Sequence, residues 1–161
     1  YLNLITRQVM KAWASTGPPE PGPIPFQKLG KPLAKCKVAL ISTAGIACHG
    51  DRPFDQEGER RNPWWGDPTY RRIPVTATAA DVGIYHLHID PRPGQADLDV
   101  LLPVQRLREL AAAGVVGAAA EWHYSTMGYV LDTKTLVTET APAIAEQMRV
   151  EQVDAAALFP A

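Results

Sequence analysis

Short continuous apolar runs alternate with stretches of helical periodicity over most of the chain. Charged or small residues bound each run, which is typical of a strand buried on both faces. The four runs are residues 37–43, 81–88, 115–122 and 153–160. Residues 102–114 and 133–152 place apolar side chains three and four residues apart and are therefore predicted helices. This order predicts an α/β fold, a three-layer domain with a mostly parallel sheet and crossover helices.

Proline and glycine divide the chain into two parts. Apolar spacing over residues 2–14 predicts one amphipathic helix, and the Pro-rich stretch that follows ends it because proline lacks an N–H donor. We therefore expect an N-terminal helix and Pro-rich arm over residues 1–36, followed by an α/β domain over residues 37–161. Within that domain, Pro142 is expected to kink or split the last helix. The connection over residues 44–80 is long, and such connections are usually functional or mobile.

Charge and composition exclude several classes of partner. Sixteen Lys and Arg against seventeen Asp and Glu leave a net charge of −1, so no basic face is available and we expect no nucleic-acid partner. No apolar run approaches the roughly 20 residues that span a bilayer, so we expect no membrane contact and a cytoplasmic protein. Two cysteines, Cys36 and Cys48, make a poor disulfide framework and are predicted to be free thiols.

All four histidines fall at the predicted carboxyl ends of strands. His49 follows the first strand, His86 and His88 close the second, and His123 closes the third. Ligands of parallel α/β sheets bind beyond these strand ends, so we expect one shared site here rather than four separate structural histidines. Cys48, Asp90 and Tyr124 accompany them.

The spacing of two histidines adds detail to this expectation. His86 and His88 lie two residues apart in a predicted strand, so both would point to the same face and bracket one small ligand. Together with His123 they would be a possible ligand set for a divalent metal ion. The closely spaced cysteines of many zinc sites are absent from the sequence.

Residues 66–74, "GDPTYRRIP", place Tyr70 and Arg71 after an Asp-Pro turn. The planar guanidinium of Arg71 suits a substrate carboxylate, and Tyr70 would line the same site. The other interpretation is that these arginines pair with surface acids or with another subunit. Both remain open.

Two further pairs of neighbouring residues have two interpretations each. Cys48 would be an activated thiol if His49 lowered its pKa, or else a small buried apolar residue. The adjacent Trp64 and Trp65 are predicted to pack at an interface between subunits, with a lid over the site as the second interpretation.

Several of these segments occur together in one known family. "KVALISTAGIACHGDRPFD", "GDPTYRRIP", "HLHID" and "HYSTMGY" appear here in the same order. Over residues 37–161 the chain resembles the selenocysteine-containing subunits of glycine, sarcosine, betaine and D-proline reductases, most of all the D-proline type. Residues 1–36 carry none of these motifs.

The resemblance implies an oxidoreductase subunit that cleaves a carbon–nitrogen bond of a small amine or amino acid with a thiol or selenol nucleophile. In D-proline reductase this happens beside a second subunit that bears a pyruvoyl group. The selenocysteine, or a cysteine in its place, follows the segment that matches "VDAAALFPA", so the nucleophile is expected just beyond Ala161. A helix starting there would stabilise its anion. We expect either that the chain continues past this point or that another chain completes the layer.

The predicted site therefore has two groups of residues. His86, His88 and His123, with Cys48 and His49, would act as catalytic groups that orient substrate and move protons. Tyr70, Arg71, Tyr124 and Asp90 would bind the substrate. A homo-oligomer or a second subunit is the expected partner. The alternatives are a metal-dependent enzyme that uses His86, His88 and His123 as ligands, and a non-catalytic subunit of a larger complex.

Overall fold

The computed structural model describes residues 8, 27–62 and 64–161. Apart from Gln8 and residues 27–36, the predicted N-terminal helix and Pro-rich arm lie outside the described residues. Among the described helices, none combines the length and the apolar character that a membrane crossing requires.

The central strand of the main sheet is β1 (Lys37–Ser42). Strand β7 (Ala155–Phe159) runs parallel to one edge of β1 and pairs with it from Val38 to Ser42. Strands β5 (Ala118–Ala119) and β6 (Trp122–Thr126) therefore share the opposite edge, where both are parallel to β1. Strand β3 (Tyr70–Pro74) completes the sheet antiparallel to β6. In the described part of the chain β7 pairs with β1 alone, so its outer edge is open.

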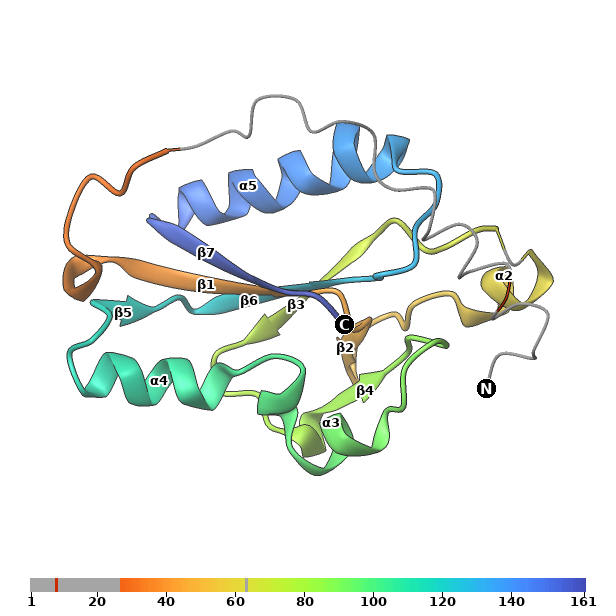
Figure 1. Cartoon of the computed structure of the whole chain (residues 1–161), viewed down its shortest axis with the longest axis horizontal. Coiled ribbons are helices and arrows are strands. Elements are labelled where there is room, and N and C mark those ends of the chain that lie inside the picture. Colours follow the sequence, from red (N-terminus) through yellow and green to blue (C-terminus); the bar gives the residue numbers. More distant parts are fainter. Residues whose placement is uncertain (1–7, 9–26, 63) are drawn as a thin grey trace.

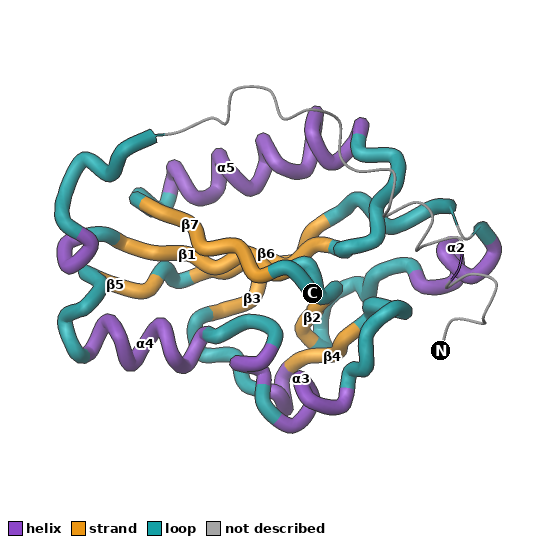
Figure 2. The backbone as a smooth tube through the Cα atoms, in the orientation of Figure 1, coloured by secondary structure: helices purple, strands orange, loops and turns teal. Residues whose placement is uncertain are grey.

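One helix covers each face of this sheet (Figure 1). Helix α5 (Ala141–Val150) lies on one face and helix α4 (Val104–Ala112) on the other, which gives three layers (Figure 2). Val38 and Leu40 of β1 pack in one buried cluster with Leu107 of α4, because alternate side chains of a strand point to the same face. The predicted α/β fold with a mostly parallel sheet is confirmed.

The last helix changes type near its proline. A π-helical turn, η4 (Leu136–Thr140), leads directly into α5, and Pro142 lies in the first turn of α5. The missing N–H of Pro142 is thus accommodated by a change in helix type.

The predicted strand over residues 81–88 is wrong beyond residue 84. Strand β4 (Val82–Ile84) pairs antiparallel with β2 (Ile46–Cys48), and the two form a separate ribbon outside the main sheet. An apolar run predicts a buried strand but does not specify its partner, and both edges of β1 are already taken by β5, β6 and β7. The chain then turns over residues 85–91.

Short helices occupy the connections between these strands. They are the α-helices α2 (Gln56–Arg61) and α3 (Arg92–Ala96), with 3₁₀ turns at Leu33–Lys35, Ala79–Asp81 and Leu98–Val100. Helix α2 is capped by Asp55, whose side chain accepts a hydrogen bond from the Gly58 N–H at 2.8 Å. The predicted long connection between the first two strands therefore holds α2, β2 and β3.

Candidate functional site

Two histidines and a glutamate form a buried cluster where the ribbon of β2 and β4 ends. The His88 Nε2 atom lies 2.5 Å from the Glu59 Oε1 atom, and the Glu59 residue is only 3% exposed. The rings of His86 and His88 meet edge to face with their centroids 5.7 Å apart. The Tyr129 ring lies against the ring of His88 at 4.4 Å between centroids. The structure thus brings His86 and His88 together and adds a carboxylate that the sequence did not predict.

Burial controls the charge of this cluster. It raises the pKa of the Glu59 carboxyl, and the nearby His88 opposes this shift. Among the described residues, His88 is the only group within ion-pair distance of that carboxylate. Burial, with a further contribution from His88, lowers the pKa of His86 to about 4, so His86 is neutral at pH 7.

The hydrogen bonds of His86 fix where its proton lies. The backbone N–H of His88 donates to the His86 Nδ1 atom at 3.1 Å, so Nδ1 is an acceptor and the neutral ring carries its proton on Nε2. A Cβ atom built at Gly128 would lie 3.0 Å from His86 Nε2 and 3.1 Å from the Thr43 Oγ1 atom. His86 Nε2–H therefore reaches the space beside Gly128 and Thr43.

The same threonine also contacts the end of β7. The backbone N–H of Ala161 donates to Thr43 Oγ1 at 2.9 Å, and the N–H of Thr43 donates to the Phe159 carbonyl at 3.1 Å. The carboxyl ends of β1 and β7 therefore meet at the space that His86 lines. This meeting point is the candidate active site, and it is the strand edge where parallel α/β proteins bind ligands.

His123 lies apart from this site and inside the sheet. Its residue is 0% exposed, and its Nδ1 atom accepts a hydrogen bond from the backbone N–H of Leu40 at 3.1 Å. The imidazole thus takes the place of a backbone acceptor between β1 and β6, which explains why β5 and β6 are separate strands. Burial lowers its pKa to about 4. In the described ranges, no three His, Cys, Asp or Glu side chains converge as a metal site, so the predicted set of His86, His88 and His123 is not assembled.

The expectation that all four histidines share one edge is also wrong for His49. Antiparallel pairing places Cys48 opposite Val82 and Ile46 opposite Ile84, so His49 lies at the end of the ribbon remote from His86. The His49 side chain is exposed and its backbone N–H donates to the Asp81 carbonyl.

Cys48 and Asp90 also differ from the expected roles. Burial, then the charges of Asp51 and Asp81, raise the pKa of the Cys48 thiol, which favours the neutral thiol over the activated one. The exposed Asp90 carboxylate is held by Arg92, whose Nη2 donates at 2.6 Å. Neither side chain belongs to the histidine cluster.

Arg71 of β3 donates hydrogen bonds to the backbone of the connection between β2 and β3. Its guanidinium stacks on the Phe54 ring at 4.3 Å and lies 3.8 Å from an Asp67 oxygen. Its N–H groups donate to the carbonyls of Arg52, Pro53 and Tyr70 and to the Thr69 hydroxyl. These contacts engage the Arg71 guanidinium within the chain, and the predicted carboxylate fork at Arg71 stays a prediction.

The aromatic candidates lie in three environments. Tyr124 is 0% exposed and its ring centroid is 6.1 Å from that of Tyr70 on the neighbouring strand. Burial raises the pKa of Tyr124. Trp65 packs against Gly58, whereas Trp64 is 63% exposed and its predicted interface contact stays a prediction.

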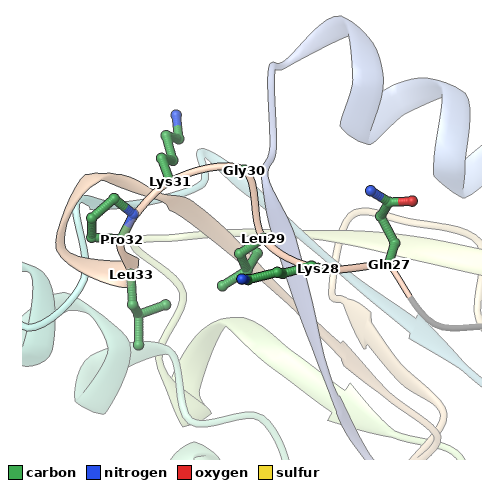
Figure 3. A pocket seen from close by; sticks show the side chains of 7 residues that line it. All are labelled: Gln27, Lys28, Leu29, Gly30, Lys31, Pro32 and Leu33. Atoms are coloured by element: carbon green, nitrogen blue, oxygen red, sulfur yellow. The ribbon is translucent and has the colours of Figure 1, made fainter.

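A separate hollow of about 650 Å³ runs along residues 27–33, ahead of β1 (Figure 3). Seven consecutive residues line it, and none of them is a candidate site residue. The hollow therefore carries none of the chemistry predicted for the site.

Three residues of the site were not predicted from the sequence. Glu59 lies among the charged residues of "QEGERR", where nothing marks it as buried. Thr43 ends the first predicted strand and Gly128 belongs to "HYSTMGY", so their positions at a strand end and in a family motif were usable signals.

Comparison with known proteins gives a consistent result. Residues 19–160 match the family model described as glycine/sarcosine/betaine reductase selenoprotein B (GRDB). The chain is 31% identical over 141 residues to the D-proline reductase subunit gamma of Acetoanaerobium sticklandii, which covers 88% of this chain and 54% of that protein. It is also 31% identical over 131 residues to the glycine reductase complex component B subunit gamma of Symbiobacterium thermophilum, covering 80% of this chain and 29% of that protein.

The chain thus spans about half, or less, of the length of these curated relatives. A betaine reductase complex component B subunit beta from Peptoclostridium acidaminophilum is 31% identical over 102 residues, covering 61% of this chain and 22% of that protein. No solved structure shows a significant match.

Proposed function

Because this chain belongs to the glycine/sarcosine/betaine reductase selenoprotein B family, we propose that it is the subunit of a cytoplasmic reductase complex that cleaves a carbon–nitrogen bond in a small amine or amino acid. The relatives are named as subunits or components of reductase complexes, which supports a reductase-related role. The substrate, the chemistry and the partner subunit belong to the proposal.

The observation that carries the proposal is the contact between Ala161 and Thr43. It holds the end of β7 beside the space that the His86 Nε2–H reaches. The resemblance places a cysteine or selenocysteine directly after this segment. Such a side chain would therefore start at the same strand edge as His86.

In the proposed reaction the thiolate or selenolate attacks the substrate carbon that bears the nitrogen. A carbon–sulfur or carbon–selenium bond forms as the carbon–nitrogen bond breaks, and the nitrogen leaves with the bonding electron pair. The departing amine takes up a proton from solvent, and the neutral His86, whose Nε2–H reaches this strand edge, would donate a hydrogen bond to the departing nitrogen. A thiol of a partner protein then attacks the sulfur or selenium and forms a disulfide or selenosulfide with it. The carbon leaves with the electron pair of the broken bond and takes up a proton, and the reductant then reduces the disulfide or selenosulfide.

His88 and Glu59 support this hydrogen bond. Glu59 contacts His88 at 2.5 Å between Oε1 and Nε2, and His88 in turn donates its backbone N–H to His86 Nδ1. This contact keeps the proton of His86 on the nitrogen that faces the strand edge. The resemblance also suggests a second subunit with a pyruvoyl group, which would bind the substrate amine.

The test uses the encoded protein, including any residues after Ala161, mixed with its co-purifying partner subunit. Amine release from glycine, sarcosine and betaine, and opening of the D-proline ring to a primary amine, are measured with dithiothreitol as reductant. We expect His86→Gln to slow cleavage about 100-fold, in line with the loss of a correctly positioned hydrogen-bond donor at the departing nitrogen. The matched control His49→Gln alters an exposed histidine remote from the strand edge and should stay near the wild-type rate. Equal rates for His86→Gln and the wild type, or no release from any substrate, would refute the proposal.

A further inference from the structure

Two neighbouring arginines on β3 differ in their contacts. Arg71 uses its donors within the chain, as described above. Arg72 has no carboxylate within ion-pair distance among the described residues, and its buried Nε has no hydrogen-bond partner there. A cation in this state is available to an anion from outside the chain.

Stacking holds the Arg72 guanidinium in place. The guanidinium carbon lies 4.1 Å from the centre of the Trp122 ring. In the antiparallel pair of β3 and β6, Arg72 is opposite Tyr124 and Trp122 is opposite Pro74, so Arg72 and Trp122 are diagonal neighbours on one face. A stacked guanidinium keeps its N–H edge free and loses little conformational entropy on binding a planar anion.

The Arg72 side chain lines an open groove of about 620 Å³ between β3 and the end of β2. Three arginines, Arg52, Arg71 and Arg72, line it against a single acid, Asp51. Cys48 also lines the groove, and its raised thiol pKa keeps this wall uncharged. The groove therefore carries net positive charge in a protein whose total charge is −1.

We propose that this groove binds a small oxyanion, a carboxylate or a phosphate, with Arg72 as the bidentate donor and Arg52 as the second cation. Carboxylate and phosphate oxygens match the fork of a guanidinium, and the unpaired donors of Arg72 gain partners on binding. This inference does not rest on the proposed reductase activity, because none of its residues lies in the histidine cluster.

The experiment titrates the protein with inorganic phosphate and, separately, with acetate. Trp122 lies against Arg72, so intrinsic tryptophan fluorescence reports binding, and calorimetry gives the dissociation constant. We expect saturable binding of at least one anion that weakens as sodium chloride is added. Arg72→Gln should weaken it on the order of tenfold or more, and Arg72→Lys, which keeps the charge but not the fork, by an intermediate factor.

The matched control is Arg106→Gln, because Arg106 pairs with Glu109 on the surface of α4, outside the groove. This variant should bind as the wild type does. Saturation by phosphate alone or by acetate alone would assign the ligand class. Absence of saturation with both anions, or equal dissociation constants for the wild type and both Arg72 variants, would overturn the inference.

Discussion

Replacing His123 tests whether an imidazole completes the hydrogen bonding of the sheet. In the His123→Ala variant the Leu40 N–H loses its acceptor inside the core, where Leu40 is 2% exposed and His123 is 0% exposed. An unpaired buried N–H costs about 1–3 kcal/mol. The cavity left by the ring adds about 2 kcal/mol. We therefore expect His123→Ala to lower the free energy of unfolding by about 3–5 kcal/mol.

The pH dependence of stability gives a sharper measurement. The pKa of His123 is about 4 in the folded protein, below the ordinary value of 6.5 that the unfolded chain is expected to keep, so the unfolded chain binds the proton more tightly. The contribution of His123 to the free energy of unfolding is therefore largest above pH 6.5 and decreases as the pH drops towards 4. Between about pH 7 and pH 5 the loss is about 2 kcal/mol for this histidine. His86, also at about 4, adds a similar loss.

The variant His123→Gln separates these two effects. Its side-chain oxygen can accept from the Leu40 N–H but cannot titrate, so it should keep more stability than His123→Ala and lose about half of the wild-type pH dependence. Urea unfolding followed by circular dichroism at pH 7 and pH 5 measures both quantities. A His123→Gln variant with the full wild-type pH dependence would refute the reasoning, as would a His123→Ala variant as stable as the wild type.

Three substitutions and one chemical-modification experiment test the remaining geometry. Gly66→Ala would place a Cβ 1.6 Å from the Tyr129 carbonyl oxygen, so thermal unfolding should show a loss of more than about 3 kcal/mol in the free energy of unfolding. In Gly114→Ala the new Cβ meets open space, but the backbone φ is +71°, so the expected loss is about 1 kcal/mol. Glu59→Gln should lower stability by about 1–3 kcal/mol by replacing the carboxylate that contacts His88. An unchanged melting temperature would contradict a stabilising contact between these two side chains. Cys48 should react with a thiol reagent more slowly at pH 7 than a free cysteine does, because its pKa is raised; equal rates would contradict this.

Apolar patterning predicted the parallel strands of the main sheet and its two covering helices, but it missed the antiparallel strand β3 and wrongly added residues 81–88 to the sheet. The runs that became β1 and β7 are apolar on both faces, and helical spacing marks α4 and α5 on either side. The third run became β5 and β6, with a break that the pattern does not show. The alternation of a strand indicates which face a side chain points to, but His123 instead turns its imidazole towards the neighbouring strand.

The candidate site was harder to predict than the sheet, because its residues are brought together by strands that are far apart in the sequence. Whether His86 approaches the end of β1 is decided by the ribbon of β2 and β4, and that pairing has no local signal. Glu59 has the composition of a surface residue and becomes buried only because α2 packs against the histidines. Arg71 and Arg72 are adjacent and chemically equal, and only their surroundings distinguish them. Arg71 donates to backbone carbonyls and to the Thr69 hydroxyl, whereas Arg72 stacks on Trp122.

Among the described residues no strand pairs with the outer edge of β7, and this affects how the protein behaves in solution. Its residues Ala155–Phe159 carry no charge, and Leu158 on this strand is 69% exposed. An unpaired edge strand of this composition can form backbone hydrogen bonds with a strand of another chain, whether that chain is a second copy of this protein or its natural partner. Recombinant material of these 161 residues should therefore precipitate or form soluble aggregates as its concentration rises, and a lysine placed at Leu158 should keep it dispersed.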